Sequence, residues 1–201
     1  MRVTRETQVE TRRRLLQAAR EEFGAAGFAA ATTRDIARRA GVAAGTLFNY
    51  FPGKEALGAA LLLEASAAAE TEFDSKRRER ESLEEALFAW VAILLRHLAP
   101  FRSWAPAVLE AGSGLLRSPS DAAAAEGERF RTLHLERVQA WLAEHGRTSE
   151  LPIDLHLYWT LFLGVVEFWS ADKSHNQEAT LALLDRSMEL FARGLTEDRR
   201  S

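Results

Sequence analysis

The segment 32–57 restricts the fold of this chain more than any other, because its residues describe two short helices joined by a tight turn. Thr32 stands three residues before Asp35, which is the spacing of a capping box, and Thr33 is an equally good N-cap. The first helix then has a buried face at the spacing i, i+1, i+4, formed by Ile36, Ala37 and Ala40. Gly41 follows directly, where the end of a helix needs a positive φ.

A second helix is predicted from about Ala44 to Phe51. Leu47 and Phe51 are four residues apart and therefore face inward together, and Pro52 and Gly53 end the helix. Two helices joined in this way form a helix-turn-helix, whose second helix is suited to lie in the major groove of DNA.

On these residues the chain resembles the TetR family of bacterial transcriptional regulators. The run TTRDIARRAGV supplies the first helix and the turn, and GTLFNYFPGKEAL supplies the recognition helix and the beginning of the next one. The resemblance covers roughly residues 11–60, and Phe48 stands where the family more often has tyrosine. It implies a dimeric DNA-binding protein whose C-terminal part varies from member to member.

The remaining sequence has helical periodicity almost throughout, with no period-2 strand pattern and no internal repeat. We therefore expect an all-α fold of about nine helices. Residues 1–55 would form a three-helix DNA-binding domain, and residues 56–201 a helical ligand-binding and dimerisation domain.

Charge is distributed unevenly between these two parts. Residues 1–55 hold ten Lys and Arg against six Asp and Glu, a balance of +4, whereas the whole chain carries −3. A basic N-terminal part on an acidic remainder suits a protein that touches phosphate at one end only.

Several classes of protein have no signature in this sequence. There is no cysteine for a disulfide or a thiolate metal site, no Glu-x-x-His pair and no Gly-x-Ser-x-Gly elbow. We expect no enzyme activity, no metal and no cofactor. The N-terminus has no uninterrupted apolar run, and the longest apolar stretch is too short to span a bilayer, so we expect a cytoplasmic protein without membrane contact.

The residues expected to touch DNA lie on both helices of the motif. Arg34, whose planar fork can pair with guanine O6 and N7, is the best base reader. Thr33 can give its hydroxyl to a phosphate, although its role as a cap also explains it. The exposed face of the second helix is formed by Ala44, Gly45, Thr46, Asn49 and Tyr50.

Within that face, Thr46 can meet a thymine methyl or a phosphate, Asn49 can read adenine, and Tyr50 is placed for a phosphate. By the resemblance, Lys54 is the phosphate-clamping lysine of the family. Two interpretations remain open for the arginines near the N-terminus, a minor-groove arm or a disordered terminus, and the second is the more common outcome. These arginines are Arg2, Arg5, Arg12, Arg13 and Arg14.

Dimerisation is predicted from the apolar helix 152–171. Its apolar residues are spread around the whole circumference, and a helix apolar on all sides must be buried on all sides. We expect this helix and the last one, the eighth and ninth of the chain, to pair with their two-fold mates, as in the resembled family. The alternative is a central helix buried within one chain.

The body is expected to enclose an apolar pocket, because five tryptophans are many for this length. The lining candidates are Trp90, Trp104, Tyr158 and Phe162, with His97 or Glu167 as the polar element. The same aromatic residues would also be explained by an ordinary core, and Glu167 by a partner across the dimer or by solvent.

These features predict a ligand-responsive transcriptional repressor that binds a palindromic operator as a dimer and is released by a small apolar or aromatic effector. In a second hypothesis the body only dimerises or binds a protein partner. In a third, the helical body binds a ligand while the N-terminal domain no longer binds DNA; Arg34, Thr46, Tyr50 and Lys54 argue against it.

Overall fold

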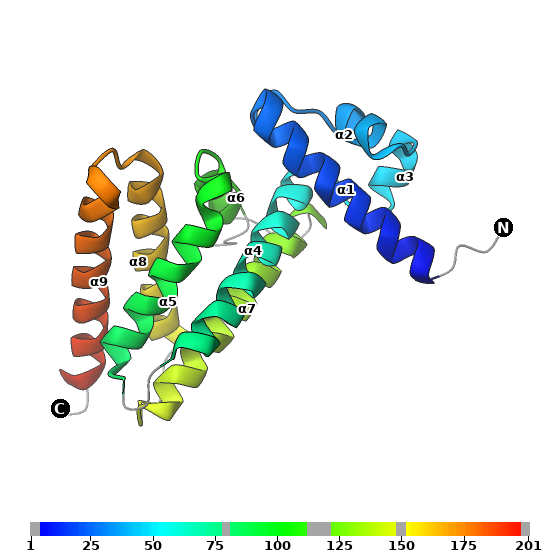
Figure 1. The fold of residues 1–201 in the computed structure, drawn as a ribbon. Coiled ribbons are helices and arrows are strands. Elements are labelled where there is room, and N and C mark those ends of the chain that lie inside the picture. Colours follow the sequence, from blue (N-terminus) through cyan, green and yellow to red (C-terminus); the bar gives the residue numbers. More distant parts are fainter. Residues whose placement is uncertain (1–4, 78–80, 112–121, 148–151, 198–201) are drawn as a thin grey trace.

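The computed structural model describes residues 5–77, 81–111, 122–147 and 152–197. Over these residues the chain forms nine α-helices and two short 3-10 helices, with no strand, which confirms the predicted all-α class. Figure 1 shows a three-helix head joined to a body of long helices that lie side by side. None of the described helices is long and apolar enough to cross a membrane.

The head consists of α1 (Arg5–Ala26), α2 (Thr33–Ala40) and α3 (Ala44–Phe48). At the start of α2 the Thr32 hydroxyl accepts the Asp35 backbone N–H at 3.1 Å. At its end Gly41 has φ 67°, so the left-handed turn expected there is present. The two caps fix both ends of α2.

The recognition helix is shorter than expected, because α3 ends at Phe48 and the prediction extended to Phe51. The next two N–H groups bond three residues back, Asn49 to Thr46 O at 3.2 Å and Tyr50 to Leu47 O at 2.9 Å, which tightens the last turn. Leu47 and Phe51 are nevertheless both buried, as predicted.

Six α-helices form the body, and α4 continues from the head into it. Figure 1 places α8 and α9 at the end of the molecule far from α2 and α3. The body helices are α4 (Lys54–Lys76), α5 (Leu83–Leu98), α6 (Ala105–Ala111), α7 (Ala122–Glu144), α8 (Pro152–Ala171) and α9 (Glu178–Glu197). The 3-10 helices are η1 (Ala99–Phe101) and η2 (His175–Gln177).

The turn into α9 is held by Asp172 and not by a Ser174–Gln177 capping box. The Asp172 carboxylate accepts the Ser174 N–H at 2.8 Å and the Thr180 N–H at 3.0 Å, and Gln177 instead accepts the Trp169 indole N–H. These hydrogen bonds, of which the one from the Thr180 side chain has the largest effect and those from Ser174 the next, hold the pKa of the Asp172 carboxyl well below its usual range. This carboxylate joins the end of α8 to the start of α9.

Head and body meet at a close approach around Gly58 in α4. The Trp104 ring stacks on Phe28 with centroids 4.9 Å apart and meets the edge of Phe23 at 5.4 Å. A Cβ on Gly58 would lie 3.1 Å from the Phe28 ring and 3.2 Å from the Trp104 ring. A glycine here lets α4 lie closer to these two rings than a residue with a side chain would.

Replacing Gly58 with alanine should therefore lower the free energy of unfolding by about 1–3 kcal/mol through overpacking, despite the better helix propensity of alanine. Urea denaturation followed by circular dichroism measures this. Gly24→Ala is the matched control, because open space surrounds that helical glycine; it should stabilise by about 0.5–1 kcal/mol. Equal stabilisation by both changes would contradict the close approach.

Candidate DNA interface and effector cavity

The residues predicted to touch DNA lie on the outer surface of α2 and α3. Arg34, Ala44, Gly45 and Asn49 are exposed. Thr33, Thr46 and Tyr50 are partly exposed. The buried side of α3 is occupied by Leu47, so the predicted face is available to a partner.

Arg34 differs from the two other arginines of α2. Arg38 pairs with Asp35 at 2.6 Å, and Arg39 pairs with Glu22 at 3.0 Å. Arg34 has no hydrogen bond or ion pair with any described residue. Its guanidinium can therefore reach an external acceptor without breaking an internal contact.

Lys54 already has a set of partners inside the protein. Its ammonium donates to the carbonyls of Phe28 at 3.0 Å, Ala29 at 2.8 Å and Ala31 at 3.4 Å. These three bonds match the three N–H donors of a lysine and hold the segment between α1 and α2 against the start of α4. Sequence reasoning missed this role, and the phosphate contact stays a prediction.

Four of the five arginines near the N-terminus are helical. Arg5, Arg12, Arg13 and Arg14 all lie within α1, so a disordered terminus is wrong for these four, whereas the minor-groove contact stays a prediction and Arg2 lies outside the described residues. The Arg14 guanidinium donates to the carbonyls of Ala40 and Gly41 at the end of α2, and Arg12 lies over the Phe51 ring. Arg12 and Arg14 thus join α1 to the helix-turn-helix.

The body has a hollow of about 330 Å³ between α4, α5 and α7, which is open to solvent on the side of Leu133, itself 49% exposed, so the predicted enclosed pocket is not found here. Leu63 and Glu70 of α4, Trp90 of α5, and Leu133, His134 and Arg137 of α7 are among its walls. Trp90 is the one predicted lining residue that contributes to the described walls of this hollow. His134 was not predicted, because nothing in the local sequence distinguishes it from the four other histidines.

Tyr158 and Phe162 are buried, and both pack against the His134 ring. The Tyr158 hydroxyl lies 3.0 Å from His134 Nε2, and the Phe162 ring is 4.4 Å from the imidazole. Burial lowers the pKa of His134 to about 3, so the ring is neutral at physiological pH. Burial also raises the pKa of Tyr158.

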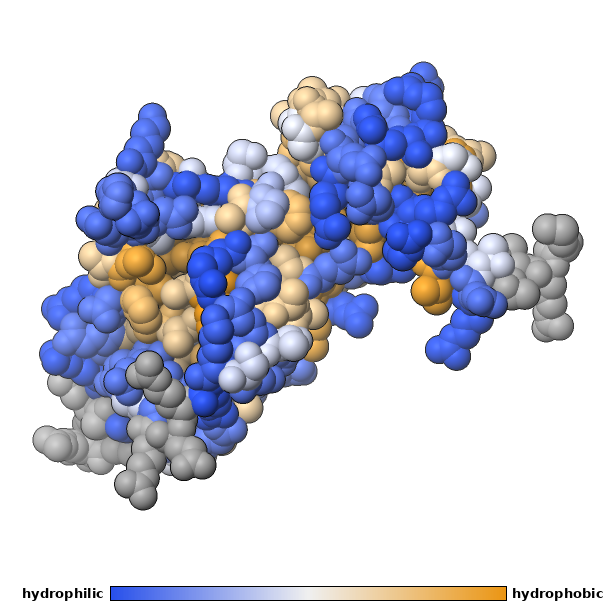
Figure 2. Space-filling model, viewed as in Figure 1, coloured by the Kyte–Doolittle hydropathy of each residue, from blue (hydrophilic) through white to orange (hydrophobic). Residues whose placement is uncertain are grey.

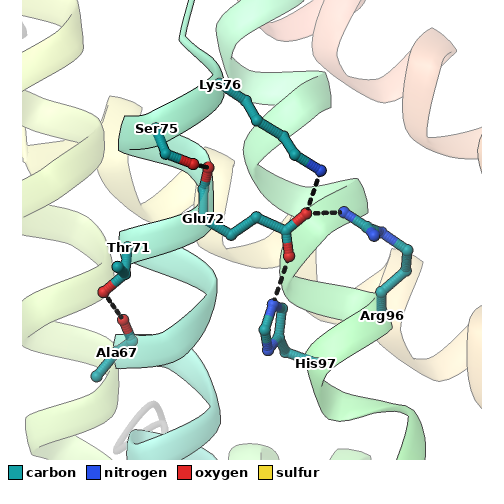
Figure 3. Close-up of polar contacts among 7 residues, drawn as sticks. All are labelled: Ala67, Thr71, Glu72, Ser75, Lys76, Arg96 and His97. Atoms are coloured by element: carbon teal, nitrogen blue, oxygen red, sulfur yellow. Dashed lines mark hydrogen bonds and ion pairs between the residues drawn. The ribbon is translucent and has the colours of Figure 1, made fainter.

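The other predicted lining residues lie elsewhere. Trp104 belongs to the aromatic contact between head and body, and Glu167 is exposed on α8. His97 faces α4, where its Nε2 lies 2.8 Å from the Glu72 carboxylate (Figure 3). Bonds from Lys76, Arg96 and His97 lower the pKa of Glu72 to about 2. Trp104, Glu167 and His97 are therefore not among the described walls of the hollow between α4, α5 and α7.

Residues 15–61 match the family described as "Bacterial regulatory proteins, tetR family". No curated protein matches. Among the described residues, no group of three or more His, Asp or Glu could hold a metal ion.

Solved structures share the fold over nearly the whole chain. A TetR transcriptional regulator from Rhodococcus sp. RHA1 has a TM-score of 0.71 at 22% identity, covering 92% of this chain and 96% of that one. FadR from Thermus thermophilus, solved with lauroyl-CoA, has a TM-score of 0.62 at 24% identity, covering 91% and 94%. The fatty acid degradation regulator FadR from Bacillus halodurans has a TM-score of 0.60 at 21% identity, covering 90% of this chain and 93% of that one.

The helix-turn-helix and the two-part helical fold define a DNA-binding transcriptional regulator. Residues 15–61 therefore form a DNA-binding domain of the TetR family of bacterial transcriptional regulators.

Lys54→Met keeps the apolar stem and removes the three donors. We expect a loss of about 1–3 kcal/mol in the free energy of unfolding, because the carbonyls between α1 and α2 lose their partner. Chemical denaturation measures the loss. Arg34→Ala, at an exposed site of the same head, should change stability by less than about 0.5 kcal/mol. Unchanged stability in Lys54→Met would contradict the structural role of the ammonium.

His134 should make stability fall with decreasing pH. Unfolded histidine titrates near ~6.5, so as pH drops from there toward the folded pKa the unfolded chain takes up a proton that the folded chain does not. His134→Gln should reduce the slope of the free energy of unfolding between pH ~6.5 and ~5 by up to about 1.4 kcal/mol per pH unit. The exposed His175→Gln is the control, and identical slopes in both variants would show that His134 is protonated when folded.

Proposed function

We propose that this chain is a ligand-responsive transcriptional repressor that binds a palindromic operator as a homodimer and leaves it when a small molecule occupies the body. The observation that carries the proposal is the separation of two exposed surfaces. The DNA face on α2 and α3 and an apolar face on α8 and α9 lie at opposite ends of the molecule (Figure 1).

The DNA face supplies both kinds of contact that operator binding needs. Arg34 reads guanine in the major groove, Asn49 reads adenine, and Thr46 meets a thymine methyl or a phosphate. Thr33 and Tyr50 bind phosphate. Ala44 and Gly45 have little or no side chain, which lets the backbone of α3 approach the bases.

We keep the division between residues 1–55 and 56–201 as the proposed domain boundary. It falls inside α4, which begins with Lys54 against the head and continues between α5 and α7 of the body. Any rotation of α4 within the body therefore moves the head. This helix is the proposed connection between effector and operator.

The dimer is proposed from an apolar surface that one chain leaves uncovered, which we call the α8–α9 face. On α8 it follows the spacing +4, +7, +4 through Ile153, Leu157, Gly164 and Phe168. On α9 it includes Leu183, Leu190 and Gly194. Phe168 is 44% exposed and Leu190 51%, and both glycines leave open space for a neighbouring helix.

Such a stripe of large exposed hydrophobic residues marks an interaction site in a folded protein. In the view of Figure 2 the head is covered mainly by hydrophilic residues, whereas hydrophobic residues reach the surface of the body. A second copy related by a two-fold axis would cover the face with its own α8 and α9 and form a four-helix interface.

The hollow between α4, α5 and α7 supports the sensing role. A ligand that fits only a body shape in which the two heads are misplaced must lower operator affinity by the coupling free energy. The hollow of about 330 Å³ with aromatic and charged walls favours this role over the alternative, a body that only dimerises or binds a protein partner.

Binding selection on random duplexes should enrich a palindrome whose half-sites are one or more helical turns apart, about 34–36 Å for one turn. Arg34→Ala should cost about 1–3 kcal/mol and relax the preference at one base pair. Arg34→Lys should keep non-specific affinity but lose that preference, because lysine lacks the planar fork. Enrichment of no symmetric site would refute the proposal for the head.

Phe168→Asp should convert the dimer into a monomer of 22.4 kDa, because the charge would be buried at the two-fold interface. Sedimentation at micromolar concentration measures the mass. Val9→Asp is the matched control, since Val9 is an exposed apolar residue of α1 outside the α8–α9 face. A wild-type monomer, or a Phe168→Asp dimer, would rule out this interface.

A further inference from the structure

Arg102, between η1 and α6, reaches across the body to the C-terminal end of α8. Its Nε donates to the Trp169 carbonyl at 2.8 Å, and its Nη2 donates to the Asp172 carbonyl. The guanidinium also lies over the buried Trp169 ring, 5.5 Å from the ring centroid. Because the last carbonyls of an α-helix have no partner within the helix, a cation with two donors supplies what the end of α8 lacks.

The same end of α8 is bonded to the start of α9, so Arg102 is attached to the whole α8–α9 turn. The Trp169 indole N–H donates to the Gln177 side chain at 3.0 Å, and the Asp172 carboxylate accepts the Thr180 N–H at 3.0 Å. Gln177 has φ 60°, a left-handed conformation that is uncommon for a residue with a side chain. These bonds hold the turn in one shape and connect Arg102 to both helices of the α8–α9 face.

Two residues after Arg102, the Trp104 side chain is attached to the head. Its ring stacks on Phe28 at 4.9 Å and meets the edge of Phe23 at 5.4 Å. The ring also lies against Gly58, where an added Cβ would be 3.2 Å from it. Trp104 therefore contacts the head and the first turns of α4 together.

The backbone between these two side chains is short and hydrogen-bonded. The Arg102 N–H bonds to the Ala99 carbonyl at 3.3 Å, and the Trp104 N–H bonds to the Phe101 carbonyl at 3.0 Å. The buried Phe101 ring packs against the Trp104 ring with centroids 5.2 Å apart. In Figure 1, α6, which begins directly after Trp104, lies between α8 and the head. A displacement of Arg102 is thus passed to Trp104.

Two attachments fix an orientation that one helix leaves free. With α4 alone, the head can swing about the point where α4 leaves the body. An attachment between Trp104 and the α8–α9 turn removes that freedom. In a dimer paired through the α8–α9 face, both turns have fixed positions relative to the two-fold axis. The attachment therefore sets where each head lies relative to its partner.

We propose that Arg102 is a positioning residue for operator binding. By tying Trp104 to the α8–α9 turn, it fixes the separation of the two recognition helices and so selects the spacing between operator half-sites. The inference rests on the proposed homodimer and specifies what sets its operator. A loss of stability alone would follow from removing any helix cap, so the test measures the half-site spacing that each variant prefers.

The test uses the palindrome selected for the wild-type protein, with its spacer lengthened or shortened by one base pair. Such a change moves a half-site by about 3.4 Å along the duplex and turns it by about 35°. Fluorescence anisotropy measures the affinity for each duplex and for a duplex with a single half-site, and sedimentation checks that each variant is a dimer.

Arg102→Met keeps the apolar stem and removes the donors. Arg14→Met is the matched control, because Arg14 also donates to two carbonyls at the end of a helix, those of Ala40 and Gly41, but joins only parts of the head.

The wild-type protein should bind the altered spacers about tenfold or more weakly, because rigidly placed heads cannot engage both half-sites at once. Arg102→Met should lose no more than about threefold for the same change, and its affinity for the single half-site should equal that of the wild type. Arg14→Met should keep the wild-type ratio between spacers while binding the single half-site more weakly, because the end of α2 has lost its partner.

A wild-type dimer indifferent to spacer length, or a spacer preference that dimeric Arg102→Met retains, would overturn the inference alone. A wild-type monomer, or a palindrome bound no more tightly than a single half-site, would overturn the proposed dimeric function and the inference with it. If Arg102→Met does not fold or dimerise, Arg102→Gln, whose amide can still donate to a carbonyl, takes its place, and the same outcomes decide.

Discussion

The contact between head and body depends on α4 lying close against a pair of stacked aromatic rings at Gly58. The Trp104 ring stacks on Phe28, and Gly58 has no side chain to hold α4 away from the two rings. Four residues earlier, the Lys54 ammonium holds the carbonyls between α1 and α2. One helix is thus fixed to the head by hydrogen bonds and to the body by close packing, and the position of the recognition helix follows from the position of α4.

Beyond that contact, the polar groups of the molecule divide into satisfied and unsatisfied ones. At the surface, Glu72 is bonded by three side chains (Figure 3), and Asp172 joins α8 to α9. Inside the body, Trp90 and His134 leave one polar atom each without a partner. A protein keeps such unpartnered atoms at a cost in free energy.

Much of the fold was predictable because helix signals are local. The helix 152–171 was predicted with the bounds of α8, and the Thr32 cap and the Gly41 turn lie where their residue types require them. Three features were not predictable, because each depends on residues distant in sequence. Lys54 is directed to carbonyls more than twenty residues away, Arg14 to the end of α2, and His134 is buried by Tyr158 and Phe162. For the same reason, aromatic content indicated a pocket but misplaced most of its lining residues.

The central claim is that occupation of the hollow in the body moves the heads of the dimer through α4. The chain has no cysteine, so Ala25→Cys at the exposed end of α1 introduces one spin label per protomer. The distance between the two labels, measured by double electron–electron resonance, tests the claim directly. The account predicts one narrow distance distribution on operator DNA and a different one when a small molecule occupies the hollow between α4, α5 and α7. The same distance in both states would contradict it.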